Sequence, residues 1–446
     1  MARIALLRSI EIQQTAPYIR QLDGLAAEAG LTLKLFYTDG DCGPDDFPGE
    51  AEKLPPGLSC DEIAERIVAW GADGAVSLSI PDENSLRDAV VREKLAAHGI
   101  PMVMHGLDAT CVLANKWETK QMLARYGLAT PAGLLVDGDL VRGRNVQAPA
   151  YQDFLLAKAE KLGYPLLSKP LWDCLATGVR FLPDAEALRS YLAEPYDGNT
   201  VLETCITGEL CSVEIVGRPG HYALQPLIWK GPTGGAPSFV FGTVRYTAPR
   251  PGPDEHFRPV AERLVRMCDD FGIEGAVEVE MIYADEDYRI IEINPRVSGS
   301  TTLSIAASGD NTYTALLAVL LGTWEQQAPG FGRRRRLALQ LPICPPTPEL
   351  TALLGERLDL VRASEFHIDG QAYANTVLTC ELDRTDELAE TLRSLTASHG
   401  LLRPAVLAEA ERLLCRPPPR RQQPPQLDQP SSHPFNSDRL DPHPCS

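Results

Sequence analysis

The stretch from Gly275 to Arg296 constrains this 446-residue chain more than any other. Two runs of strand-forming residues flank the polar tetrapeptide Ala-Asp-Glu-Asp, a pattern that predicts a β-hairpin. Side chains alternate between the two faces of a strand, so Glu278 and Glu280 share one face of the first strand. By the same rule, Glu292 and Asn294 share one face of the second strand. Acidic side chains therefore stand where a half-buried strand should carry apolar residues.

Burial of these carboxylates without compensation would cost free energy. A hard cation with oxygen ligands removes that cost, and magnesium that bridges nucleotide phosphates usually takes one or two carboxylates. We therefore interpret the hairpin as the floor of a metal and nucleotide site. The alternative is a solvent-facing strand edge with ordinary charges, which the apolar sequence Ile-Ile-Glu-Ile around Glu292 disfavours.

The sequence Glu-Ile-Asn-Pro-Arg, which begins at Glu292, resembles the metal-binding signature of the ATP-grasp superfamily. Biotin carboxylase, D-alanine–D-alanine ligase and the bacterial L-amino-acid ligases belong to this superfamily. The resemblance implies ATP as a substrate and two magnesium ions bound by Glu280, Glu292 and Asn294, for which Mn²⁺ could substitute. It also implies that Arg296 holds an acyl phosphate and its tetrahedral intermediate.

Lys169 lies near the end of a predicted strand, in the sequence Tyr-Pro-Leu-Leu-Ser-Lys-Pro. A strand lysine usually only extends its charged end to solvent. The Ala-Thr-Gly-Val that follows, however, resembles the loop that covers the phosphates in ATP-grasp proteins, with Thr177 and Gly178 as contacts. This loop lacks the paired serines often found there, so its contacts are expected to be backbone amides. We expect Lys169 to bind phosphate.

Lys116 resembles the second phosphate lysine of the superfamily, although Asn115 stands where an aspartate is usual. We expect Lys116 to contact the nucleotide phosphates as well. Lys120, one helical turn further on, is expected to lie on the helix surface.

The sequence Glu-x-x-x-x-Gly-Glu, between the lysine strand and the acidic hairpin, resembles the hinge that grips the adenosine. The resemblance implies that the backbone from Thr204 to Ile206 meets the adenine edge and that Glu209 accepts the ribose hydroxyls. Glu203 either joins this ATP-binding site or is an exposed edge residue.

The sequence Ser-Gly-Ser-Thr-Thr-Leu-Ser at residues 298–304 predicts a turn that enters a helix. A helix N-terminus favours a negative group, so the backbone amides from Gly299 and Ser300 onward are candidates to stabilise the acyl oxygen. Ser304 is a candidate for the substrate's carboxylate, with a buried or capping serine as the alternative.

The order of predicted elements divides the chain into four parts. Residues 1–114 alternate strands and helices as βαβ units do, which predicts a Rossmann-like domain with a parallel sheet. Residues 115–325 predict an α+β ATP-grasp domain, and residues 326–415 predict a small, β-rich C-terminal α+β subdomain. The proline-rich tail, residues 416–446, has few large apolar side chains and is predicted to be disordered.

Three further segments carry structural expectations. Lys230 to Pro237 contain too many glycines and prolines for a regular element, so we predict an irregular, mobile lid, with a plain surface loop as the alternative. Residues 15–29 are predicted to form one helix. The basic run Arg333–Arg336 is expected to be a solvated strand or loop edge.

The composition limits the partners of the chain. A net charge of −18 disfavours a nucleic-acid surface. Neither a signal peptide nor a run of eighteen apolar residues is found, so no membrane partner is expected. Eleven cysteines without CxxC spacing are expected to be reduced thiols in a cytoplasmic protein. The expected partners are a small-molecule carboxylate and an amine, and a homodimer stays open.

The arrangement Asn-Pro-Arg followed by Ser-Gly-Ser resembles L-amino-acid ligases more than D-alanine–D-alanine ligase, whose signature lacks this arginine. The resemblance implies a ligase that phosphorylates an amino acid's carboxylate and couples it to an amine, yielding a dipeptide-type amide, ADP and phosphate. The alternatives are a carboxylase of the biotin carboxylase kind, a purine-pathway ligase and a non-catalytic ATP-binding regulator.

Overall fold

A computed structural model describes residues 2–9, 16–43, 46–142, 149–173, 176, 178–194, 198–236, 242–368 and 371–415. Thr177, Pro237 and the predicted disordered tail lie outside the described residues. Within the described part of the chain, no helix is both long and apolar enough to span a membrane.

The N-terminal part forms a five-stranded parallel sheet in the order β3-β2-β1-β4-β5, as predicted. Its strands are β1 (Ala2–Arg8), β2 (Leu31–Tyr37), β3 (Glu50–Lys53), β4 (Gly74–Ser77) and β5 (Met102–Val103). Its helices are α1 (Ala16–Ile19), α2 (Leu22–Ala29), α3 (Cys60–Trp70), α4 (Asp82–Ala96) and α5 (Leu107–Ala114). The single helix predicted over residues 15–29 is wrong, because a turn at residues 20–21 separates α1 from α2.

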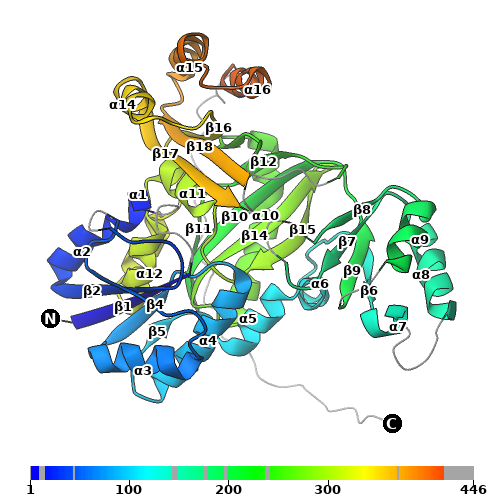
Figure 1. The fold of residues 1–446 in the computed structure, drawn as a ribbon, viewed down its shortest axis with the longest axis horizontal. Helices are drawn as coiled ribbons and strands as arrows, with labels where there is room; N and C mark the ends of the chain where they lie inside the picture. The colour runs from blue at the N-terminus through cyan, green and yellow to red at the C-terminus, as the bar shows by residue number, and fades with distance from the viewer. Residues whose placement is uncertain are drawn as a thin grey trace, which may run out of the picture.

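A nine-stranded sheet occupies the centre of the molecule, in the order β15-β14-β10-β12-β13-β16-β18-β17 with β11 beside β10 (Figure 1). Its strands are β10 (Glu209–Arg218), β11 (His221–Leu224), β12 (Ile228–Pro232), β13 (Arg245–Thr247), β14 (Gly275–Ala284), β15 (Asp287–Asn294), β16 (Leu337–Pro342), β17 (Asp359–Ile368) and β18 (Gln371–Cys380). Pairing of β13 with β16 carries the sheet across the predicted domain boundary at residue 325. The domain boundaries themselves stay predictions.

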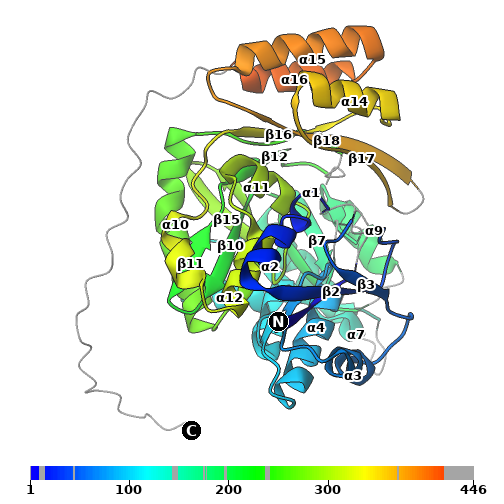
Figure 2. The same cartoon turned by 90° about the vertical axis from the view of Figure 1, so that its left-hand side faces the viewer.

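The two faces of the central sheet differ in chemistry. On β14, the buried apolar residues Val277, Val279 and Met281 alternate with Glu278 and Glu280. The apolar face joins the core beneath α10 (Pro251–Asp270), and over β16–β18 it is covered by α14 (Pro348–Arg357), α15 (Thr385–His399) and α16 (Pro404–Leu414) (Figure 2). The opposite face packs against α11 (Thr301–Ser308) and α12 (Thr312–Leu320). The acidic side chains therefore point into an interface between parts of the chain.

A small antiparallel sheet in the order β6-β9-β7-β8 stands beside the central sheet (Figure 1). It consists of β6 (Gly133–Val136), β7 (Leu166–Pro170), β8 (Arg180–Leu182) and β9 (Thr200–Thr204), with α7 (Gly138–Arg142), α8 (Pro149–Leu162) and α9 (Ala185–Ala193). Helix α6 (Lys116–Arg125) precedes this sheet and packs against β15.

The basic run Arg333–Arg336 follows α13 (Trp324–Gln327) and the short helix η3 (Ala328–Gly330). Arg334 lies 3.5 Å from the carboxylate of Asp254, and Arg336 Nε donates to the carbonyl of Ala306 at 2.8 Å. The prediction of a solvated edge is therefore wrong for these two arginines. Arg334 pairs with a carboxylate, and Arg336 binds a carbonyl in the last turn of α11.

Gly332 fixes the chain between η3 and β16. Its φ is +77°, and an added Cβ would lie 1.8 Å from the carbonyl oxygen of Leu224 at the end of β11. Both the backbone conformation and the contact distance therefore require glycine.

We predict that Gly332→Ala lowers the free energy of unfolding by more than about 2 kcal/mol, because strain and steric overlap add. Gly330→Ala is the matched control, since its added Cβ meets nothing within 4 Å. Urea unfolding of both variants checks this, and equal stabilities would contradict the close contact with β11.

Candidate functional site

The acidic hairpin is formed by β14 and β15. Their antiparallel register places Glu278 opposite Asn294 and Glu280 opposite Glu292, so these side chains occupy two neighbouring rows on one face. Asp285 and Glu286 both adopt positive φ, of 51° and 59°, as the tight two-residue turns that favour hairpins require. The predicted hairpin and its shared acidic face are confirmed.

Lys230 bridges two of these carboxylates, and the sequence did not indicate it. It lies within β12, so the predicted irregular lid is wrong at residues 230–232, where pairing with β10 outweighs the glycine and proline content. Its Nζ donates to Glu278 Oε1 at 2.9 Å and to the Glu280 carboxylate, and its side chain is 2% exposed. Although burial would raise the pKa of Glu278, the Lys230 ammonium lowers it to about 2.

Lys116 is the first residue of α6. Asn115 caps this helix, because its side-chain oxygen accepts from the amides of Trp117 and Glu118 at 3.0 and 3.2 Å. Asparagine therefore caps the helix here, as an aspartate at this position would. Lys116 Nζ lies 3.3 Å from Glu292 and donates to the carbonyl of Asp173 at 3.0 Å. The side chain thus joins the hairpin to the start of the predicted phosphate loop.

Glu203, Lys169 and Lys120 form a buried charge cluster at the small sheet. Glu203 is 2% exposed and lies 2.7 Å from Lys169 Nζ and 3.0 Å from Lys120 Nζ. The surface position predicted for Lys120 is wrong, and so is the alternative of an exposed edge for Glu203. Residues one turn apart share a helix face, so the spacing between Lys116 and Lys120 was the signal that could have placed Lys120 in the site.

The predicted adenosine hinge joins the small sheet to the central one. The amides of Thr204 and Cys205 donate to the carbonyls of Ala132 and Pro165, at 2.9 and 3.0 Å, and the carbonyl of Ile206 accepts from the Thr233 hydroxyl at 2.8 Å. These two amides are bonded within the protein, so the predicted adenine contacts would have to come from the other backbone groups of the hinge.

Gly178 and Glu209 flank the hinge in sequence and are held by polar contacts. The Gly178 amide donates to Asp173 Oδ2 at 3.3 Å, and an added Cβ would lie 2.4 Å from Pro170 Cγ, so the loop turns back tightly on β7. Glu209, at the start of β10, accepts a hydrogen bond from Arg250.

Arg296 is held by an acidic residue from the N-terminal part of the chain. Its Nε lies 2.6 Å from Asp82 Oδ1, at the start of α4, and its Nη2 donates to Asn294 Oδ1 at 3.1 Å. Both Arg296 and Asp82 are largely buried. The sequence gave no sign of Asp82, because the pair joins residues more than two hundred positions apart. The N-terminal part therefore reaches directly into the site.

The predicted turn into a helix at residues 298–304 is present and leads into α11. The Ser300 amide donates to Ser298 Oγ at 3.0 Å, whereas Gly299 is exposed. Ser304 is completely buried, which favours the alternative of a core serine over contact with a substrate.

Comparison with known proteins identifies the family to which the central part of the chain is similar. The family model of the ATP-grasp domain matches residues 113–300, the segment that holds the lysines, the hinge and the acidic hairpin. The chain contains an ATP-grasp domain. Its fold is the ATP-grasp fold, with a parallel N-terminal sheet and a largely antiparallel central sheet.

Several known proteins resemble this chain over more than the ATP-grasp domain. A D-alanine–D-alanine ligase of Syntrophotalea carbinolica is 26% identical over 231 residues, which cover 50% of this chain and 69% of that protein. The L-amino acid ligase of Bacillus licheniformis superposes with a TM-score of 0.63 at 19% identity, over 88% of this chain and 97% of that one. The biotin carboxylase domain of Hydrogenobacter thermophilus 2-oxoglutarate carboxylase, crystallised with MgADP and bicarbonate, superposes with a TM-score of 0.64 at 13% identity, over 93% and 99%.

The donor set of the ATP-grasp hairpin fits magnesium bound together with nucleotide phosphates. Among the described residues, no group of three or more His, Cys, Asp or Glu side chains could hold a metal by itself. The facing carboxylates of Glu280 and Glu292, with the amide oxygen of Asn294 in the next row, would supply the one or two carboxylates that Mg²⁺ takes together with substrate phosphates and water.

Glu214 is a further carboxylate of the ATP-grasp domain that the sequence did not reveal. It lies on β10 opposite Glu278 and accepts hydrogen bonds from the hydroxyls of Thr301 and Thr312, the first residues of α11 and α12. One buried side chain thus positions two helix N-termini. Burial raises the pKa of Glu214 to about 7.

This raised pKa predicts a pH-dependent stability. The folded-state pKa lies above the usual value of 4.5, so the contribution of Glu214 to stability is complete below pH 4.5 and is lost as pH rises through 7. Relative to wild type, Glu214→Gln should gain stability on the order of 3 kcal/mol between pH 4.5 and 8. Urea unfolding of both proteins at these pH values tests this, and a constant difference would refute the shift.

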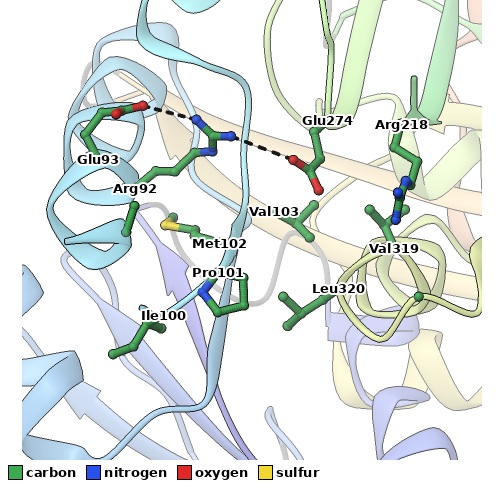
Figure 3. A pocket seen from close by; sticks show the side chains of 12 residues that line it. Arg92, Glu93, Ile100, Pro101, Met102, Val103, Arg218, Glu274, Val319 and Leu320 are labelled. Atoms are coloured by element: carbon green, nitrogen blue, oxygen red, sulfur yellow. Dashed lines mark hydrogen bonds and ion pairs between the residues drawn. The ribbon is translucent and has the colours of Figure 1, made fainter. Parts of the chain in front are cut away.

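A separate cavity of about 510 Å³ lies between α4, β5 and the end of α12 (Figure 3). Arg92 lies there 3.8 Å from Glu274, and Met102, Val103 and Leu320 contribute apolar walls. None of the predicted site residues lines it. The carboxylate hairpin, and not this cavity, is therefore the candidate site.

Proposed function

We propose that the protein is an ATP-dependent ligase that phosphorylates the carboxylate of an amino acid and couples it to an amine, forming a dipeptide-type amide, ADP and phosphate. The observation that carries this proposal is the position of Arg296. Its guanidinium lies beside Asn294 and is held by Asp82, so a planar cation stands next to the row of Glu280 and Glu292.

In the first step, a carboxylate oxygen of the substrate bonds to the γ-phosphorus of ATP while the bond to the ADP oxygen breaks. Lys116 and Lys169, together with Lys230, supply ammonium groups for the phosphates. Magnesium, and by proposal Mn²⁺ in its place, would be held by Glu280, Glu292 and Asn294 and would neutralise phosphate charge.

In the second step, the amine nitrogen bonds to the acyl carbon, phosphate leaves with the electrons of the carbon–oxygen bond, and the nitrogen releases a proton. Negative charge develops on the acyl oxygen, and donors placed in advance stabilise it. We assign this role to Arg296 and to the exposed backbone at Gly299. The competing carboxylase would use bicarbonate in the first step.

One observation bears on where the enzyme is located. All nine cysteines within the described residues are free thiols, which supports a cytoplasmic location. The substrates proposed are small molecules.

The deciding experiment measures ADP release by the purified protein with single amino acids, amino-acid pairs and bicarbonate. The ligase predicts ADP release only when an acid and an amine are both supplied. Release that requires bicarbonate and no amine would replace the ligase with a carboxylase.

Glu292→Gln should lower the rate of ADP release at least about 100-fold, since it removes a charged ligand of the metal. Glu286→Gln, at the exposed turn of the same hairpin, is the matched control and should retain wild-type activity. Thermal unfolding verifies that both variants fold. Full activity of Glu292→Gln would remove this residue from the metal site.

Arg296→Lys should lower kcat about 100-fold while leaving the KM for ATP unchanged, since lysine keeps a charge opposite Asp82 but loses the planar pair of donors. This variant is preferable to Arg296→Ala, which would leave the buried carboxylate of Asp82 uncompensated. Steady-state ADP release measures both constants. A parallel loss in kcat and in ATP affinity would assign Arg296 to nucleotide binding.

A further inference from the structure

We propose that the cavity between α4, β5 and the end of α12 binds a free amino acid with an apolar side chain, held as a zwitterion by Arg218 and Glu274. The cavity is separate from the acidic hairpin, so this inference goes beyond the proposed function. Its volume of about 510 Å³ lies within the range of roughly 300–1,000 Å³ that small-molecule sites occupy.

Two basic and two acidic side chains line the cavity (Figure 3). They are Arg92 and Glu93 of α4, Glu274 directly before β14, and Arg218 at the end of β10. These four charges sum to zero, so the lining favours neither a net anion nor a net cation. A ligand that carries one charge of each sign matches this lining.

Arg218 provides the position for the carboxylate of the ligand. Among the residues that the structure describes, none forms a hydrogen bond or an ion pair with its guanidinium, which Figure 3 shows without a dashed line. The side chain is only partly exposed. A guanidinium presents paired donors that fit both oxygens of a carboxylate.

Glu274 provides the position for the ammonium group. Its carboxylate lies 3.8 Å from Arg92 Nη2, which is beyond hydrogen-bond distance, whereas Arg92 Nη1 donates to Glu93 Oε1 at 3.1 Å. Arg92 is therefore bound mainly by Glu93, and the Glu274 carboxylate can accept from another donor. An ammonium group offers three N–H donors.

Arg218 and Glu274 stand close enough in the sheet to share one amino acid. Gly217 on β10 is opposite Gly275 on β14, and the strands are antiparallel. The next residue outward on each strand is Arg218 and Glu274, respectively, so the cation and the anion emerge from neighbouring positions at one end of the sheet. The carboxylate and the ammonium of an α-amino acid are likewise neighbours, because both are attached to one carbon.

The remaining wall suits an apolar side chain. Met102 and Val103 of β5 and Val319 of α12 are buried apolar residues of this wall, and Leu320 is half-buried. Contact with an apolar side chain removes the exposed part of such a wall from water, which stabilises the bound state. The cavity thus combines both charges with an apolar surface.

The elements that line the cavity also carry residues of the hairpin site. Helix α4 begins at Asp82, which binds Arg296. Strands β10 and β14 carry Glu214 and Glu278. A ligand that contacts α4, β10 and β14 at once would therefore hold together the elements on which the hairpin site is built.

Calorimetric titration of the ATP-free enzyme with leucine, 4-methylpentanoate and isoamylamine tests the site, because the three probes share an apolar group and differ in charge. Leucine should bind at least about 10-fold more tightly than the other two, since each of them lacks one charge-assisted hydrogen bond. Arg218→Met should weaken leucine binding at least about 10-fold and leave the binding of isoamylamine and of ATP unchanged. Arg218→Lys should restore part of the loss. Arg357→Met, at an exposed position at the end of α14, is the matched control and should bind as wild type does.

Hydrogen exchange locates the bound leucine, which could also bind at the hairpin as a substrate. Leucine should slow amide exchange over residues 100–103 and 318–322 in wild type and not in Arg218→Met. Leucine binding that Arg218→Met leaves unchanged, or equal affinity for the three probes, would overturn the site. Neither measurement involves turnover, so leucine binding that depends on Arg218 would retain this site even if ADP release required no amine and the ligase proposal failed.

Discussion

The pairing of Lys230 with Glu278 and Glu280 is the interaction on which the site depends. Two carboxylates on a buried face of the central sheet would repel each other and lose hydration, and one ammonium from the neighbouring strand β12 offsets both costs. Lys116 from α6 does the same for Glu292. The charges thus fix where β12 and α6 lie relative to the hairpin, and they keep three acidic groups together at one place.

The same principle connects the distant parts of the chain. Asp82 brings the start of α4 to Arg296, and Glu214 joins β10 to the starts of α11 and α12. Glu203 binds both Lys169 and Lys120 and so orders the small sheet. Each contact joins a charged or polar pair across elements far apart in sequence. The site therefore lies where the N-terminal part, the small sheet and the central sheet meet.

Features set by local sequence were predictable. The alternation of apolar and polar residues placed Glu278 with Glu280 on one face of β14 and Glu292 with Asn294 on one face of β15. The βαβ pattern predicted the parallel sheet, because it too depends on the spacing of apolar residues along the chain. The break between α1 and α2 and the strand at Lys230 were not predictable in this way. Glycine and proline favour irregular structure locally, but pairing with β10 and β13 extends β12 through Gly231.

Features that depend on register between strands could not be predicted from one sequence. Glu214 opposes Glu278 only because of how the strands are ordered in the central sheet. Asp82 likewise meets Arg296 only through the packing of the N-terminal part against the end of the hairpin. Lys120 is different, since its spacing from Lys116 already placed it on the same helix face.

Transfer of oxygen from the acid substrate to phosphate tests the central claim most directly. An amino acid labelled with ¹⁸O in its carboxylate is incubated with the enzyme, ATP and an amine acceptor, and the released phosphate is analysed by mass spectrometry. An acyl phosphate intermediate predicts one labelled oxygen in each phosphate and the other in the amide product. Unlabelled phosphate, formed at the rate of ADP release, would contradict activation of the carboxylate.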